Sequence, residues 1–240
     1  MTDRDNVLWL QCWRDQRTDF NQKTVNQLLT KFWPGLDLPQ GSRVFVPLCG
    51  KSFDMIWFAN QGYEVIGIEL SPIAVRAFFR ENNLRPVRRQ VGRFTLWQYG
   101  RLSILCGDYF SLTMAVLGHI DAVYDRAALT ALPEEIRKHY VAHLRLIVPA
   151  AAMVFLLTTE DAEEKETLSQ AFGVAEEIKI LYSENFAIEL VHVESEFEAD
   201  PESPDQLPER TEYKVYRLLV KPRNQLPMID HKKPVKHYLK

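Results

Sequence analysis

The sequence lacks the second glycine that a phosphate-binding turn between a strand and a helix requires. Residues 44–59, VFVPLCGKSFDMIWFA, pass from an apolar strand-like run through Gly50, Lys51 and Ser52 into a helix-like run. A P-loop has a further glycine five residues before its Gly-Lys pair, because successive backbone N–H groups must wrap the phosphate. Phe45 occupies that position, which excludes a Walker-type nucleotide site.

Cysteine is scarce, and a secretion signal and long apolar runs are missing. Cys12, Cys49 and Cys106 are odd in number and far apart. This pattern is typical of free thiols in a reducing cytosol and not of a disulfide framework. The first ten residues, MTDRDNVLWL, contain no signal-peptide core, and no run approaches the length of a membrane span. We therefore expect a soluble cytoplasmic protein without a membrane partner.

Charge of one sign is not in excess either. The 240 residues carry a formal net charge of −3, which gives no reason to expect a nucleic-acid partner. The six histidines are dispersed, so no metal site is expected. The length suits one large domain with a sizeable core.

What is present from residue 43 onward is an alternation of strand-like and helix-like runs. Apolar runs predict strands within residues 43–48, 63–70, 94–100, 101–110, 119–125 and 151–159. Helical spacing predicts helices within residues 52–62, 72–83 and 133–147, the second opened by Ser71 as N-cap and Pro72 at the first helical position. Apolar strands separated by helices are typical of an α/β protein with a parallel sheet covered on both faces.

The last third of the chain has a different pattern. Residues 176–197 and 212–221 alternate more regularly, as antiparallel strands do, and the Pro- and acid-rich residues 198–211 predict an exposed hairpin loop between them. Three parts are therefore expected: an N-terminal segment of residues 1–40, a main domain of residues 41–221 and a basic tail of residues 222–240. The tail is interpreted either as solvated chain or as a contact site for an acidic partner.

Three polar or glycine-containing positions follow the predicted strands. In an open α/β sheet, ligands bind beyond the carboxyl ends of the strands. Gly50 allows close backbone approach, Glu69 lies nineteen residues further on, where an acid can accept both ribose hydroxyls, and Asp108 with Tyr109 can contact an adenine. Each also has a structural alternative: Glu69 as an acid at a helix N-terminus, and Asp108 as a turn residue. Together they favour an adenosine pocket.

The kind of adenosine ligand follows from the glycine content of the first turn. A dinucleotide normally requires G-x-G-x-x-G, because the pyrophosphate lies against bare backbone. Here Gly50 is the one glycine in Pro47-Leu48-Cys49-Gly50-Lys51. This favours S-adenosylmethionine, which has no phosphate, over NAD.

The N-terminal segment contains aromatic residues at a helical spacing. Trp9 and Trp13 are four residues apart and share a helix face, and Phe20 follows them. They are interpreted either as packing against the sheet or as a lid whose rings surround a sulfonium cation and exclude water.

Four segments resemble the thiopurine S-methyltransferase family: WLQCW, FVPLCGKSFDMIWFANQGYEVIGIELS, AFFRENNL and YDRAALTALP. The resemblance covers residues 9–160, with nearly the same order and spacing of segments as in the family. The resemblance implies the Rossmann-like fold of class I methyltransferases, with a mostly parallel seven-stranded sheet, an antiparallel C-terminal strand pair and helices on both faces. It also implies S-adenosyl-L-methionine as cofactor. The residues that it implies for the cofactor site are the lid residues Trp9, Trp13 and Phe20, then Leu48 and Gly50 in the loop, Glu69 at the ribose, Asp108 and Tyr109 at the adenine, and Arg126 where the cofactor and acceptor sites meet.

The chain departs from the family pattern at three places. Asn21 stands where the family usually has histidine, and Asp108 stands where a smaller polar residue is common. Residues 158–173, TTEDAEEKETLSQAFG, replace the usual Gly-Pro-Pro-Phe cover loop over the acceptor.

The predicted activity is methyl transfer to small aromatic or heterocyclic thiols, by in-line displacement in a monomeric enzyme. Arg126 is assigned electrostatic stabilisation or orientation of the acceptor, because arginine cannot act as a base; its alternative is a salt bridge to Asp125 or Glu69. Cys49 is interpreted as packing. Other acceptors remain open, namely halide, thiocyanate, selenium or tellurium oxyanions and oxygen nucleophiles, as does a non-catalytic adenosyl-ligand-binding protein.

Overall fold

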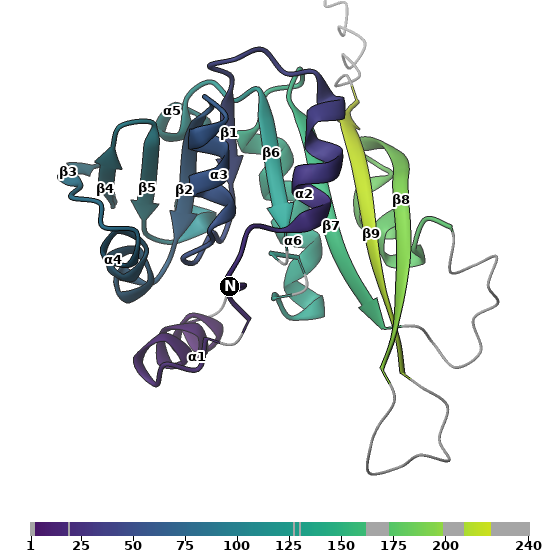
Figure 1. Cartoon of the computed structure of the whole chain (residues 1–240), viewed down its shortest axis with the longest axis horizontal. Coiled ribbons are helices and arrows are strands. Elements are labelled where there is room, and N and C mark those ends of the chain that lie inside the picture. The colour runs from purple at the N-terminus through teal and green to yellow at the C-terminus, as the bar shows by residue number, and fades with distance from the viewer. Residues whose placement is uncertain are drawn as a thin grey trace, which may run out of the picture.

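The computed structural model describes residues 3–18, 20–126, 128–129, 131–161, 173–198 and 209–221. The strands within these ranges form one sheet of nine in the order β3-β4-β5-β2-β1-β6-β7-β9-β8 (Figure 1). Their bounds are β1 (Arg43–Val46), β2 (Glu64–Glu69), β3 (Val87–Val91), β4 (Phe94–Tyr99), β5 (Leu102–Cys106), β6 (Ala122–Arg126), β7 (Met153–Asp161), β8 (Phe186–Glu198) and β9 (Glu209–Val220).

The centre of the sheet is parallel and both of its ends are antiparallel. Strands β5, β2, β1, β6 and β7 run in one direction, whereas β3 and β4 at one end and β9 and β8 at the other pair antiparallel to their neighbours. The parallel α/β sheet and the antiparallel C-terminal pair are thus confirmed. The expected number of seven strands is wrong for the described part of the chain. The strand β3, VRRQV, is an exposed edge strand, so it lacks the apolar face by which sequence reasoning recognises strands.

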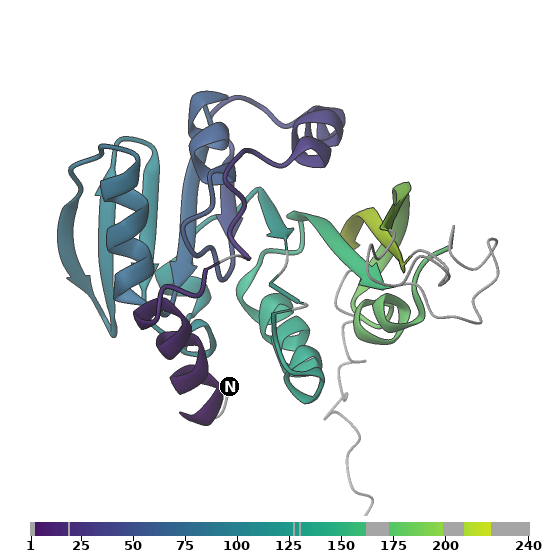
Figure 2. The same cartoon turned by 60° about the horizontal axis from the view of Figure 1, so that its bottom comes forward.

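Helices cover both faces of the sheet, and each layer has its own buried cluster (Figure 2). One layer consists of α2 (Gln27–Phe32), the 3₁₀ turn η1 (Trp33–Leu36), α3 (Asp54–Asn60) and α4 (Pro72–Glu81). The other consists of α5 (Met114–Leu117), α6 (Glu134–Ile147) and α8 (Glu176–Tyr182), with the 3₁₀ turn η2 (Tyr109–Ser111). The N-terminal helix α1 (Asp3–Arg14) lies beyond the end of the sheet at which β6 and β7 finish, near α4 (Figure 1).

The start of α4 follows directly from its sequence. The side chain of Ser71 caps the helix by accepting the Ala74 N–H at 3.3 Å, and Pro72 is the first helical residue. A proline has no N–H to donate and its fixed φ suits this position. The helix is therefore held in place directly after β2.

The prediction for residues 176–182 is wrong. They form the helix α8 instead of the start of an antiparallel strand. Ile178 and Tyr182, four residues apart, are the buried side chains of this segment, and Glu176 and Glu177 lie in its first turn. An acidic first turn and apolar residues at i and i+4 favour a helix. Over so short a run the same residues also fit the strict alternation of a strand, which conceals the helical pattern.

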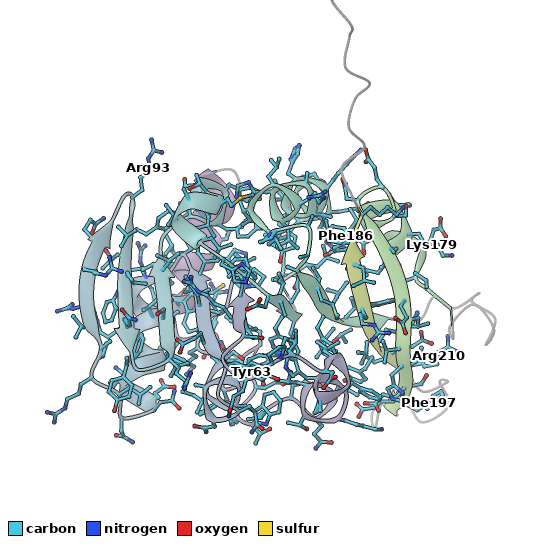
Figure 3. All side chains as sticks on the ribbon, turned by 90° about the horizontal axis from the view of Figure 1, so that it is seen from above. Tyr63, Arg93, Lys179, Phe186, Phe197 and Arg210 are labelled. Atoms are coloured by element: carbon cyan, nitrogen blue, oxygen red, sulfur yellow. The ribbon has the colours of Figure 1, made fainter. Side chains whose placement is uncertain are left out.

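The two ends of the sheet are far apart in space. Arg93, in the turn between β3 and β4, projects from one edge in Figure 3, and Phe197 and Arg210 lie at the opposite edge. Phe197 and Arg210 are partners in the β8–β9 register. The predicted basic tail, residues 199–208 of the predicted hairpin loop and residues 162–172 of the acidic segment lie outside the described residues. Of the helices that are described, none combines the length and apolar character needed to cross a bilayer.

Candidate active site

A cavity of about 330 Å³ lies beyond the carboxyl ends of β1, β2, β5 and β6. It is walled by the loops that follow these strands and, on the other side, by α1 and the residues just after it. All nine residues predicted for the site line this cavity: Trp9, Trp13, Phe20, Leu48, Gly50, Glu69, Asp108, Tyr109 and Arg126.

The loop after β1 turns sharply because two of its residues have left-handed backbone conformations. Leu48 has φ 45° and Gly50 has φ 53°. The Cys49 N–H donates to the Ile68 carbonyl at 3.0 Å, which ties the loop to β2. A Cβ atom on Gly50 would lie 3.1 Å from Asn21 Oδ1 and 3.4 Å from the Trp13 ring, so glycine is needed both for the turn and for the close approach of the N-terminal segment.

The Cys49 side chain packs against β2. Its side chain is buried, and a Cβ atom on Gly67 of β2 would lie 2.6 Å from the Cys49 sulfur. The thiol therefore fills the space that the missing side chain of Gly67 leaves. Burial raises its pKa well above the usual value, so the thiol stays protonated and the packing interpretation fits.

Glu69 ends β2 with its carboxyl group facing the loop after β1. Oε2 accepts the Gly50 N–H at 2.9 Å, and Oε1 accepts the Ser71 N–H at 2.6 Å. Burial raises the pKa of this carboxyl to about 7, although both backbone hydrogen bonds act in the opposite direction. Its orientation is thus fixed by two backbone donors, one from each neighbouring loop, and its remaining lone pairs are available to a ligand hydroxyl.

Asp108 and Tyr109 occupy the loop after β5 in different ways. The Asp108 carboxylate accepts the Phe110 N–H at 3.2 Å and the Ser111 hydroxyl at 3.3 Å, so it caps η2. Tyr109 is 2% exposed, and its hydroxyl donates to the Tyr140 carbonyl at 3.3 Å. Asp108 is therefore a capping residue at the edge of the cavity, and Tyr109 is mainly a core residue that reaches the cavity wall.

The three aromatic residues of the N-terminal segment form one group. The Phe20 ring makes edge-to-face contacts with Trp9 at 5.4 Å and with Trp13 at 5.6 Å between ring centroids. Trp13 is buried and Phe20 is 46% exposed. None of the three belongs to either core cluster, and all line the cavity, so they cover the cavity and do not pack on the sheet.

Arg126, the last residue of β6, forms an ion pair that the sequence did not predict. Its Nε lies 3.0 Å from Asp54 Oδ2, and its Nη2 lies 3.5 Å from the Ser52 hydroxyl. The predicted alternative partners, Asp125 and Glu69, are both wrong. Asp125 is fully buried and accepts the Tyr140 hydroxyl at 2.6 Å, and burial raises its pKa to about 6.

Asp54, which pairs with Arg126 but is not among the residues that line the cavity, is a residue that sequence reasoning missed. It is 1% exposed, accepts hydrogen bonds from the Asn26 N–H at 2.8 Å and the Tyr124 hydroxyl at 2.8 Å, and forms an ion pair with the Arg126 Nε at 3.0 Å. An acid in the first turn of a helix is usually explained by the helix dipole. Its three partners lie 28, 70 and 72 residues away along the chain, so no local pattern could reveal them.

Comparison of the sequence with protein families finds one match over most of the chain. The model of thiopurine S-methyltransferase (TPMT) matches residues 4–221. A thiopurine S-methyltransferase of Stutzerimonas stutzeri (strain A1501) is 62% identical over 218 residues, which cover 91% of this chain and 92% of that protein. Another, from Nitrosomonas eutropha, is 43% identical over 78% of this chain and 85% of its own length.

Comparison of the fold finds methyltransferases of low sequence identity. A SAM-dependent methyltransferase from Anabaena variabilis has a TM-score of 0.55 at 13% identity and covers 88% of this chain and 94% of its own. The 1,6-didemethyltoxoflavin-N1-methyltransferase of Burkholderia thailandensis, solved with S-adenosylhomocysteine, also has a TM-score of 0.55, at 12% identity, and covers 89% of this chain and 87% of its own. The expected class I methyltransferase fold is thereby confirmed.

Proposed function

The chain belongs to the thiopurine S-methyltransferase family, and we propose that it transfers the methyl group of S-adenosyl-L-methionine to the sulfur of small aromatic or heterocyclic thiols. The observation that carries this proposal is the cavity in which the family's site residues gather. Its loops come from the carboxyl ends of β1, β2, β5 and β6, where ligands of open α/β sheets bind.

The residues present fit an adenosyl ligand without phosphates. The Glu69 carboxyl group has both oxygens oriented by backbone donors and keeps lone pairs for the two ribose hydroxyls. Asp108 and Tyr109 stand on the adenine side, and Leu48 and Gly50 form the loop beneath the ligand. The rings of Trp9, Trp13 and Phe20 cover a sulfonium, whose positive charge an aromatic face attracts.

The chemistry that the cofactor supplies is an activated methyl group on a sulfonium. The protein contributes alignment of the acceptor with that group and exclusion of water. A thiol or thione ionises near neutral pH, so the site needs no strong base. Arg126, which keeps Nη1 for other partners while Nε faces Asp54, stabilises the negative charge of the acceptor.

The protein acts as a cytoplasmic monomer on a small-molecule acceptor. Support for the monomer comes from the cavity, because the described residues of one chain supply its walls. Support for the compartment comes from Cys12, Cys49 and Cys106, which are free thiols in the structure.

The experiment that tests this function measures methyl transfer from labelled S-adenosylmethionine to 6-mercaptopurine, thiophenol, selenite, iodide and a catechol. Arg126→Ala should lower turnover at least a hundredfold, as expected for removal of a group that stabilises charge in the transition state, with far less effect on cofactor affinity by calorimetry. The matched control is Arg101→Ala, which removes an arginine paired with Glu64 at 2.8 Å and half exposed.

Three outcomes would contradict the proposal in different ways. Equal losses of turnover and cofactor binding in Arg126→Ala would remove the assigned role of this residue. Preference for iodide, selenite or the catechol would keep the cofactor and replace the acceptor. Cofactor binding without turnover on any acceptor would indicate a binding protein.

A further inference from the structure

Arg126 creates an electrostatic problem for the proposed function. Among the described residues that line the cavity, it is the one with a permanent positive charge. S-adenosylmethionine is itself a cation at sulfur, and the lining of the site is largely apolar. Two unit charges of the same sign in such a site repel each other by several times the value in water. An uncompensated arginine would therefore oppose binding of the methyl donor.

The product of the reaction does not meet this problem. S-adenosylhomocysteine carries a neutral thioether in place of the sulfonium, and otherwise offers the same adenosine and amino-acid groups. A positive charge near the sulfur thus weakens binding of the donor and leaves binding of the product almost unchanged. A site with an uncompensated arginine would retain product in preference to donor.

Asp54 lies where it offsets this charge. Its Oδ2 is 3.0 Å from Arg126 Nε, and its side chain is 1% exposed, so water screens the pair little. The carboxylate cannot turn away, because Oδ1 accepts the Asn26 N–H and Oδ2 also accepts the Tyr124 hydroxyl. Asn26 in turn caps α2 with its own side chain, so the carboxylate is held from two separate elements.

The described acids that line the cavity, Glu69 and Asp108, have other partners. Glu69 accepts the Gly50 and Ser71 N–H groups, and Asp108 accepts the Phe110 N–H and the Ser111 hydroxyl. Of the described acids, Asp54 is the one that pairs with the Arg126 guanidinium.

We propose that Asp54 is a positioning and charge-compensating residue, which holds the Arg126 guanidinium through Nε and offsets part of its charge, so that a sulfonium can bind beside it while the Nη side still faces the acceptor. Asp54 thereby sets the preference of the site for the methyl donor over the demethylated product. This inference rests on the proposed function. It assigns to Asp54 an effect on ligand choice that a purely structural carboxylate would not have.

The test compares two dissociation constants, measured by calorimetry for S-adenosylmethionine and for S-adenosylhomocysteine. Asp54→Asn keeps the size of the side chain and removes its charge. We expect it to weaken donor binding about tenfold more than product binding, the ratio that a repulsion of about 1.4 kcal/mol produces. Tyr124→Phe removes a hydrogen bond to the same carboxylate without changing its charge, and should leave the ratio of the two constants as in the wild type.

A second variant tests the same charge pair by removing its positive member. Arg126→Gln leaves Asp54 uncompensated and should shift the ratio toward the donor, the opposite direction to Asp54→Asn. The double variant Asp54→Asn/Arg126→Gln removes both charges and should return the ratio close to that of the wild type. Because Arg126→Gln changes a side chain at the cavity wall, it keeps the inference testable even if Asp54→Asn does not fold.

Equal losses of affinity for both ligands in Asp54→Asn, or no shift in Arg126→Gln, would overturn the inference and leave the proposed function intact. Failure of the wild-type protein to bind either ligand would overturn both. A shift of the ratio in Tyr124→Phe as large as that in Asp54→Asn would show that geometry, and not charge, decides the preference.

Discussion

The two walls of the cavity are built in different ways. The first, here called the cradle, consists of residues 47–52, 69–71 and 108–109, and backbone hydrogen bonds fix it: Cys49 N–H to Ile68, Gly50 and Ser71 N–H to Glu69. The second, here called the cover, consists of α1 with Phe20 and Asn21. Ring contacts hold the cover itself together, because Phe20 packs against Trp9 and Trp13. A long hydrogen bond, 3.4 Å, from the Lys51 N–H to Asn21 Oδ1 and the close approach of Trp13 to Gly50 join it to the cradle.

The difference between cradle and cover suggests a division of work. A cradle whose acceptor atoms are set by backbone donors recognises the ligand without rearranging. A cover joined to the cradle by a long hydrogen bond and a packing contact can open at low cost, because one hydrogen bond contributes only about 1 kcal/mol. We therefore expect changes in the cradle to alter how tightly the cofactor binds, and changes in the cover to alter mainly how fast it leaves.

Glu69→Ala should have the largest effect on the cradle. It removes the proposed acceptor of the ribose hydroxyls and leaves the Gly50 and Ser71 N–H groups without a partner. Hydrogen bonds to a charged group contribute about 1.5–3 kcal/mol each, so cofactor affinity should fall at least about a hundredfold by calorimetry. A loss of less than threefold would mean that the cradle does not hold the ribose through this carboxyl.

Gly50→Ala tests the join between cradle and cover. An alanine at this position is strained by the left-handed backbone conformation, and its Cβ atom lies close to Asn21 and Trp13. Such overpacking costs about 2 kcal/mol, which corresponds to about thirtyfold weaker cofactor binding.

The matched control for this change is Gly92→Ala. Gly92 has nearly the same φ, 57°, and nothing within 4 Å of an added Cβ atom. It should lose stability to a similar extent through backbone strain and keep cofactor affinity. Equal affinities in the two variants would show that cradle and cover are not coupled at this contact.

The pH dependence of cofactor binding tests whether the Glu69 carboxylate of the cradle binds the ribose. Ribose hydroxyls donate to the ionised carboxylate, and burial raises the pKa of Glu69 to about 7 in the empty site. Affinity for S-adenosylhomocysteine should therefore rise about tenfold between pH 6 and pH 8, with proton release on binding at the lower pH. Because the folded-state pKa is raised, the stability contribution of Glu69 to the empty protein has the opposite course: it is full below about pH 4.5 and is lost as pH rises through 7.

Glu69→Gln provides the control for this titration, since an amide does not ionise in this range. The dependence attributed to Glu69 should disappear from its calorimetric profile, while any titration of the ligand remains. A profile identical to that of the wild type would place the titrating group elsewhere.

Phe20→Ala should have the smallest effect and should separate the cover from the cradle. The ring contacts both Trp9 and Trp13 but is 46% exposed, so the melting temperature should change little. Cofactor affinity should fall about fivefold, because the variant no longer makes the two edge-to-face ring pairs that hold Phe20 against α1 and keep the cover ordered over the cavity. Stopped-flow fluorescence should find the change in the dissociation rate; a change confined to the association rate would argue against a cover that retains the ligand.

Sequence reasoning succeeded where a function depends on a short stretch of chain. Glu69 lies nineteen residues after Gly50, and both strand-to-loop turns could be located from apolar runs and from Ser71 as a helix cap. It failed for β3, whose residues are exposed, and for α8, whose seven residues are too few to separate a helical period from an alternating one. It also failed for the partner of Arg126, because Asp54 is 72 residues away in the chain.

The sequence by itself determined the parallel α/β sheet, the strand ends at which the site lies and the types of residue that line it, because apolar periodicity, caps and turn glycines act over a few residues. Only the tertiary structure decided that Asp54 pairs with Arg126, that the three aromatic side chains cover the cavity instead of packing on the sheet, and that Glu69 takes its orientation from two loops. These contacts join segments brought together by the order of the strands, and long-range order of this kind leaves no periodic trace in the chain.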